Sequence, residues 1–187
     1  MTVNYDRIIE LLRKIYPKLS LDNVKADIEK TVEEALGIDI KYSDMFHLES
    51  KNDVSGYVHV VNGKPEIVVN GNDTEYRRRF TIAHELGHIF LHWAWLPDRK
   101  IDENLVEVSY RNNIYDTNEK QIKEYEADAF AAEFLAPISK VRESLDQYRR
   151  SDIYNKEEQI QRLIHDYKIS NGTAFYQWKE ANNYNKG

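Results

Sequence analysis

The chain has 187 residues, of which 41% are hydrophobic and 31% charged, as in an ordinary folded domain and unlike a disordered segment. Its 32 acidic residues outnumber its 26 basic ones, and the net charge of −6 disfavours nonspecific binding to nucleic acid or anionic lipid. The absence of cysteine excludes disulfides, cysteine nucleophiles and thiolate metal ligands. Because no signal-peptide pattern or membrane-length apolar run is visible, we expect a cytoplasmic protein that makes no membrane contact.

Hydrophobic spacing predicts a helix from about residue 8 to Pro17 and a second helix from about Ser20 to Gly37. Three β-type segments follow, at 38–42, 56–61 and 66–70, and a hairpin turn at 62–65 joins the last two. The remaining predicted elements are a helix at 74–92 capped by Asp73 or Thr74, a strand at 106–110, and helices at 118–135, 138–148, 156–168 and 173–183. This order predicts an α+β fold. We expect one domain over 1–150 and a helix-turn-helix-like segment over 151–187.

Residues 84–88 read His-Glu-Leu-Gly-His, an HExxH pattern. On a helix, His84, His88 and Glu85 lie at 0°, 40° and 100° around the axis and therefore share one face. Two neutral imidazoles one turn apart can bind one divalent metal, and the carboxylate between them is placed to act as general base. The alternative is a surface helix that carries two histidines by chance. Apolar residues on the rest of the helix favour a buried helix instead.

A catalytic zinc site needs a third protein ligand. A histidine ten positions after the first is excluded because residue 94 is alanine, and no cysteine exists. A glutamate on the helix at 118–135 remains. Glu124 falls within the apolar stripe of that helix, where an unpaired carboxylate would be costly, whereas Glu126 and Glu133 point to the opposite side and are interpreted as facing solvent. We therefore favour Glu124 as the ligand, the alternative being a salt bridge to one of the arginines at 77–79.

Further side chains are candidates for supporting roles. Asp128, one turn after Glu124, is placed to accept the outer N–H of a ligating histidine. His92 is interpreted as a helix-end histidine at the solvent boundary, with a substrate contact as the second interpretation. Gly87 would allow another backbone, such as that of the glutamate helix, to approach closely. The candidates for oxyanion or substrate contacts are Tyr110, Arg111, Tyr115 and Tyr125.

Three blocks in order resemble the ImmA/IrrE metallopeptidases: Glu66–Asn70, Arg79–His88, and the stretch from Glu124 to Phe134-Leu135-Ala136-Pro137. The family usually ends the third block with Leu-Leu-Met-Pro, which here is a packing change. The resemblance covers roughly residues 55 to 140. It implies a minimal zincin-like (gluzincin-type) fold, metal on His84, His88 and Glu124, and Glu85 as general base.

The resemblance also implies a function. ImmA-type members are anti-repressors that cleave a helix-turn-helix repressor of a phage or mobile element, and IrrE-type members cleave a repressor in the radiation response. We expect the short, ImmA-like type, because few residues are left for the sensor domain of longer IrrE-type proteins. Zinc is the expected cofactor, with manganese as the alternative. We expect the substrate to bind as an extended strand, with the hairpin that ends at Asn70 offering the sheet edge.

A competing hypothesis comes from the C-terminal helices, whose helix–turn–helix pattern is typical of DNA-binding units. Residues 156–187 carry five lysines or arginines against four acids, and a groove reader normally has a clearer basic excess. We therefore do not expect direct DNA binding, and favour a packing unit or a docking surface for the substrate. A DNA-binding or toxin–antitoxin regulatory protein of the same family is the alternative function. The sequence sets no expectation for the oligomeric state.

Overall fold

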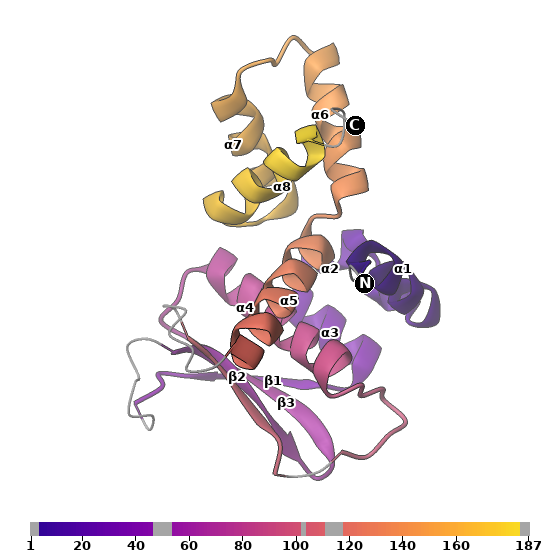
Figure 1. The fold of residues 1–187 in the computed structure, drawn as a ribbon, viewed down its shortest axis with the longest axis vertical. Helices are drawn as coiled ribbons and strands as arrows, with labels where there is room; N and C mark the ends of the chain where they lie inside the picture. The colour runs from indigo at the N-terminus through magenta and orange to yellow at the C-terminus, as the bar shows by residue number, and fades with distance from the viewer. Residues whose placement is uncertain (1–3, 47–53, 102–103, 111–117, 184–187) are drawn as a thin grey trace.

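The computed structural model describes residues 4–46, 54–101, 104–110 and 118–183 (Figure 1). Its strands are β1 (Asp39–Ser43), β2 (Val54–Val61), β3 (Lys64–Asn70) and β4 (Val106–Tyr110). A 3-10 turn η1 (Pro17–Leu19) and a π-helical turn η2 (His88–His92) accompany the helices. The helices are α1 (Tyr5–Ile15), α2 (Leu21–Ala26), α3 (Ile28–Leu36), α4 (Glu75–Gly87), α5 (Asn118–Leu135), α6 (Ile138–Arg150), α7 (Lys156–Tyr167) and α8 (Asn171–Asn183).

The described strands form one mixed sheet in the order β1-β3-β2-β4. β1 runs parallel to β3, while β2 is antiparallel to both β3 and β4. The predicted hairpin is confirmed, but its turn is shorter than predicted, because Lys64 and Pro65 already belong to β3. Val61 pairs with Lys64 across Asn62 and Gly63, whose φ angles of 53° and 75° match a two-residue turn of the primed type. The α+β prediction is thereby confirmed.

The helix predicted from Ser20 to Gly37 is wrong in one respect, because it is broken at Asp27. Asp27 adopts an extended conformation (φ −157°, ψ 100°), and its carboxylate accepts the N–H of Lys30 at 3.0 Å as the N-cap of α3. A short polar side chain that bonds to the backbone competes with helix continuation and favours a cap. Ser20 caps α2 in the same way through Asn23.

Helix α4 lies against β2 and β3 on one side and against α5 on the other (Figure 1). Its Ile82, Ala83 and Leu86 are fully buried in the main hydrophobic core. Burying a side chain of the size of Ile82 or Leu86 stabilises the fold by about 1.5–3 kcal/mol. α4 is therefore an interior helix, and any polar group on it must be satisfied by protein or ligand.

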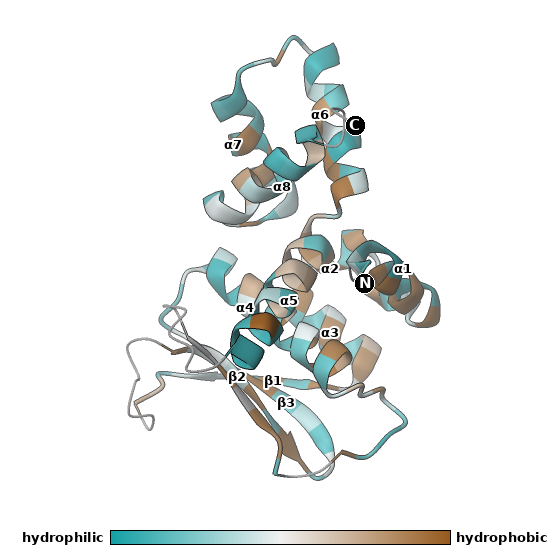
Figure 2. Cartoon of the chain, in the orientation of Figure 1, coloured by the Kyte–Doolittle hydropathy of each residue, from teal (hydrophilic) through white to brown (hydrophobic). Residues whose placement is uncertain are grey.

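Helices α6, α7 and α8 pack together at the end of the molecule away from the sheet (Figure 1). The end of α6 and the start of α7, which lie farthest from the sheet, are hydrophilic (Figure 2). Since α6 contacts α7 and α8, it belongs structurally with the C-terminal helices, and the boundary at residue 150 stays a prediction. Among the residues described, no helix combines the length and apolar character needed to cross a membrane.

Candidate metal centre

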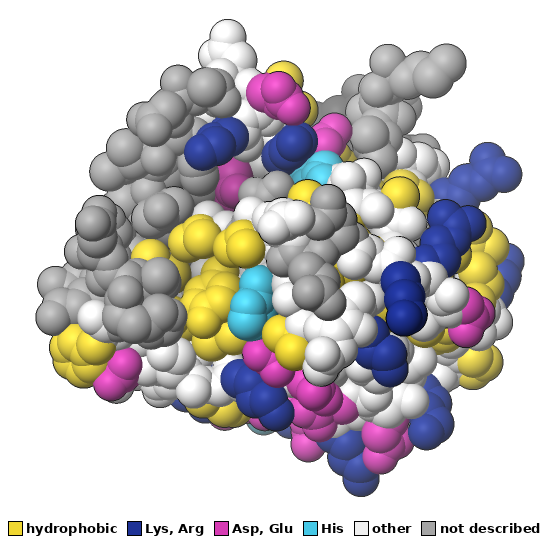
Figure 3. Space-filling model, turned by 90° about the horizontal axis from the view of Figure 1, so that it is seen from below, with side chains coloured by type: hydrophobic (Ala, Val, Ile, Leu, Met, Phe, Trp, Pro, Cys, Tyr) yellow, Lys and Arg dark blue, Asp and Glu magenta, His cyan; other side chains and the backbone are white. Residues whose placement is uncertain are grey.

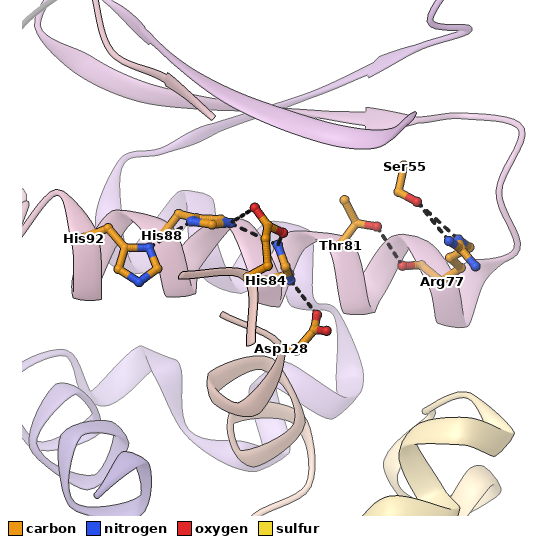
Figure 4. Close-up of polar contacts among 8 residues, drawn as sticks. Ser55, Arg77, Thr81, His84, His88, His92 and Asp128 are labelled. Atoms are coloured by element: carbon orange, nitrogen blue, oxygen red, sulfur yellow. Dashed lines mark hydrogen bonds and ion pairs between the residues drawn. The ribbon is translucent and has the colours of Figure 1, made fainter. Parts of the chain in front are cut away.

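The two histidines of the HExxH pattern lie at the end of α4 and the start of η2. His84 is 5% exposed and His88 is fully buried, and their Nε2 atoms lie 3.0 Å apart. Figure 4 shows His84, His88 and His92 following one another along this helix, with Asp128 toward α5. The shared face that the spacing predicts for His84 and His88 is therefore present, and it is closed to bulk water.

Glu124 reaches this face from α5. The two helices come close at Gly87, where an added Cβ would lie 2.9 Å from Ala127 Cα and 3.2 Å from the Ala127 carbonyl oxygen. The expectation that another backbone approaches Gly87 is confirmed, and the neighbour is the glutamate helix. Glu124 lies one turn before Ala127 and is buried. The missing side chain of Gly87 thus sets how near the carboxylate comes to the histidines.

The donor atoms of these three residues are spaced as one metal ion requires. Besides the 3.0 Å between the imidazoles, Glu124 Oε2 lies 3.1 Å from His84 Nε2, and Oε1 lies 3.4 Å from His88 Nε2. Ligands at about 2.0–2.1 Å from a tetrahedral ion are about 3.3–3.4 Å apart. His84, His88 and Glu124 form the group that could hold a metal ion within the described residues, and their donor chemistry fits zinc.

The charges of the site are strongly coupled. Burial lowers the pKa of His84, but hydrogen bonds to Asp128 and Glu124, with Glu85 nearby, outweigh it and raise the pKa to about 10. Burial raises the pKa of Glu124, yet hydrogen bonds from His84 and His88 bring it far below its usual range. Glu124 is therefore an anion in the folded chain, and a buried anion calls for a cation beside it.

The alternative partner for Glu124, an arginine from residues 77–79, is contradicted by the structure. Arg77 donates to Ser55 Oγ, and Arg78 donates to the carbonyl of Asp73. Arg79 donates to the carbonyls of Val24 and Lys168. These arginines brace the site helix, as the burial of α4 requires. Glu124 instead contacts the imidazoles of His84 and His88.

Glu85, between the two histidines, has no exposed surface. Its charge acts on His84, since Glu85 is among the groups that raise the pKa of that imidazole. Glu85 follows His84 directly on the helix, 100° around its axis, and both residues are buried. A carboxylate there can exchange a proton with a reacting group at the site.

Two outer contacts hold the imidazoles. Asp128 Oδ1 lies 2.8 Å from His84 Nδ1, which is the position expected for it. His92 Nδ1 lies 2.9 Å from His88 Nδ1, and its Nε2 lies 3.1 Å from Glu126. His92 ends the helix as predicted, but its side chain is only 6% exposed and points inward rather than to solvent. Its spacing of four from His88, which repeats the spacing from His84 to His88, is the signal that points to this contact.

Other predicted side chains are placed differently. Glu133, expected to face solvent, is buried, because α6 and α8 cover that side of α5. Tyr125 is exposed and lines a cavity together with Asp128, the residue that contacts His84, and with Tyr176 of α8, so its substrate or oxyanion contact stays a prediction. The backbone of Tyr110 ends β4, whereas its side chain, like Arg111 and Tyr115 entirely, lies outside the described residues.

An α+β fold that brings an HExxH helix and a buried glutamate together is the arrangement of a metal-dependent peptidase. The comparison of the chain with family models agrees. Residues 33–179, well over half of the chain, match Peptidase_M78, described as the IrrE N-terminal-like domain. The chain belongs to this family, an ImmA/IrrE-type family of metallopeptidases. A search of curated proteins found no match.

Proposed function

We propose that this protein is a zinc-dependent endopeptidase with a zincin-like, gluzincin-type catalytic centre. The observation that carries the proposal is the convergence of His84, His88 and Glu124 to within 4.8 Å of one another, with Glu85 on the same helix. His84, His88 and Glu124 would hold the metal. Manganese is the alternative ion, since it also accepts histidine and carboxylate ligands.

When bound, the cation would supply Lewis-acid activation of a water molecule and of the scissile carbonyl. Glu85 accepts a proton from the attacking water and delivers it to the nitrogen of the leaving amine as the C–N bond breaks. Asp128 accepts the Nδ1–H of His84 and so keeps the Nε2 lone pair directed at the site. The buried walls of α4 and α5 exclude bulk water, which strengthens these charge interactions.

The substrate would bind as an added strand on β4. The hairpin that ends at Asn70 does not offer an edge, because β3 lies between β1 and β2. The outer strands of the described sheet are β1 and β4, and β4 packs against α4. Backbone groups of an outer strand can pair with an extended peptide. Val106, in β4, is 55% exposed, which fits an edge open to a partner.

We further propose that the substrate is a helix-turn-helix repressor and that the protein acts in the cytoplasm as an ImmA-like anti-repressor. The support is the ImmA/IrrE family and the near balance of charge in the C-terminal helices, which gives DNA binding little driving force. The sheet end of the molecule, opposite to the C-terminal helices, also carries acidic and basic side chains near one another (Figure 3). The alternative function is a regulatory role through DNA binding or as part of a toxin–antitoxin pair, and the experiment must distinguish it from repressor cleavage.

The test mixes the purified chain and zinc with the repressor encoded beside its gene, with and without a chelator. Mass spectrometry of the fragments identifies the cut. We expect cleavage at one bond that the chelator abolishes. An intact repressor under all conditions, together with salt-dependent binding of the chain to duplex DNA, would contradict the repressor-cleavage proposal and favour the DNA-binding alternative.

The general-base role has its own control. Glu85→Gln keeps the size of the side chain and removes the proton acceptor, so zinc content and folding should be retained while cleavage is lost. Glu75→Gln, at the exposed start of the same helix, should leave cleavage unchanged. An active Glu85→Gln enzyme would refute this mechanism.

A further inference from the structure

The second imidazole of the candidate metal centre is held by another histidine rather than by a carboxylate. His88 Nδ1 lies 2.9 Å from His92 Nδ1, and His92 Nε2 lies 3.1 Å from Oε2 of Glu126. These contacts form a row from the buried ligand to a carboxylate on α5 that is 28% exposed. His84, in contrast, meets Asp128 directly.

The backbone at this point is unusual. His88 and His92 are the first and last residues of the π-helical turn η2, which is closed by the Trp93 N–H donating to the His88 carbonyl at 3.0 Å. π-helical turns are rare and occur frequently at functional sites. Here the two rings lie 5.0 Å apart between centroids and are inclined by 58°, so a ring nitrogen of each meets the other.

We propose that His92 is a positioning residue that fixes the tautomer and the ring orientation of His88, and that Glu126 holds His92 in turn. The inference rests on the proposed function, because it assumes that His88 is a metal ligand. It assigns no contact with substrate to His92.

The proton positions follow from the contacts. A neutral imidazole carries one N–H and one lone pair. If His88 gives the Nε2 lone pair to a cation, its proton lies on Nδ1 and must be donated to an acceptor. His92 Nδ1 is then the acceptor, so the proton of His92 lies on Nε2, where the Glu126 carboxylate accepts it. Each of the three contacts is satisfied in this assignment, and neither ring is charged.

The two histidine ligands are thus held by different kinds of partner. Ligating histidines usually donate their second N–H to a carboxylate, a carbonyl or water, and these partners contribute substantially to metal affinity. Asp128 brings a negative charge directly against His84, whereas the neutral ring of His92 separates the charge of Glu126 from His88. His92 therefore orients His88 without placing a further anion against it.

The experiment measures zinc affinity of the full chain by competition with a chromophoric chelator. His92→Leu fills similar space but removes the acceptor, and it should weaken zinc binding by about 10–100-fold. His92→Asn places an amide oxygen near the position of Nδ1 and should recover most of the lost affinity. His165→Asn, at an exposed histidine of α7, is the matched control and should bind zinc like the original chain.

A second measurement needs no variant. Nitrogen-15 NMR of the zinc-loaded original chain should show the proton of His88 on Nδ1 and that of His92 on Nε2. A His92 proton on Nδ1, unchanged zinc affinity in His92→Leu, or an asparagine variant no better than the leucine variant would each overturn the inference. Failure of the original chain to bind zinc would instead refute the proposed function, and this inference with it.

Discussion

The buried carboxylate of Glu133 allows a test that is separate from the metal centre. The residue is 6% exposed, and its carboxylate accepts the Ile138 N–H at 3.1 Å on one oxygen and 3.3 Å on the other. Burial raises the pKa of Glu133 to about 7, and Asp6 adds to the rise. The Ile138 N–H, Gln177 and Arg13 act in the opposite direction without cancelling it.

The sign of the effect follows from proton binding in the two states. The folded chain holds the proton of Glu133 more tightly than the unfolded chain, in which the pKa is 4.5. The corresponding stability is therefore fully present below the unfolded pKa and is lost as the pH rises through the folded pKa. The whole shift corresponds to about 3 kcal/mol, of which about 2 kcal/mol falls between roughly pH 5.5 and 8.5.

The assay is urea unfolding of the original chain and of Glu133→Gln across that range. The glutamine resembles the protonated carboxyl, so its variant should gain about 2 kcal/mol relative to the original chain as the pH rises. Titration of the site histidines is the same in both chains and cancels in the difference. Glu119→Gln, an exposed position on the same helix, should show no such gain. A constant difference between the Glu133→Gln variant and the original chain would refute the argument that burial raises this pKa.

Two further predictions concern the metal ligands. Gly87→Ala places a methyl group 2.9 Å from Ala127 Cα, and the resulting overpacking should cost about 1–3 kcal/mol of stability, against at most about 1 kcal/mol of helix propensity gained. Zinc affinity should fall as well, because α5 carries Glu124; unchanged affinity in a stable variant would show that the approach at Gly87 does not position the carboxylate. Zinc at about 100 times its dissociation constant should raise the unfolding free energy of the original chain by about 2.7 kcal/mol. Glu124→Ala should lose most of that gain in a thermal melt, and an equal gain in both chains would mean that the ion binds elsewhere.

The HExxH face and the position of Glu124 could be predicted because both depend on one helix at a time. Angles around an axis follow from residue spacing, and the apolar neighbours of Glu124 on α5 indicate that it points inward. The composition alone excludes a cysteine ligand, and the alanine at residue 94 excludes a histidine ten positions after His84. The contact of Asp128 with His84 follows from the same helical arithmetic.

The burial of Glu133 could not be predicted in this way. On a helix with one buried face, a residue about 180° from Glu124 faces water, but α5 is buried on two sides. Its second side is buried by α6 and α8. The Gln177 contact with Glu133 joins residues 44 positions apart in the sequence, so the spacing along α5 alone does not indicate it. The order of the strands likewise depends on the parallel pairing of β1 with β3, which no local pattern near Asn70 specifies.

The C-terminal helices hold both of the helices that carry the metal ligands. Arg79 of α4 donates to the carbonyl of Lys168, in the turn before α8. Gln177 of α8, 1% exposed, donates to the carbonyls of Ala132 and Ala136 at the end of α5 and just beyond it, at 3.0 and 2.7 Å. A buried carbonyl that loses such a donor costs about 1–3 kcal/mol.

Gln177→Leu should therefore lower the unfolding free energy by about 1–3 kcal/mol and also weaken zinc binding, because the end of α5 is no longer held. Gln161→Leu, at an exposed position of α7, serves as the control for an added apolar side chain in the same unit. Urea unfolding without metal measures the first effect, and chelator competition measures the second. If Gln177→Leu lowers stability but binds zinc like the control, the C-terminal helices support the fold and not the metal centre. If both effects appear, the helix-turn-helix-like segment is part of the scaffold that positions Glu124.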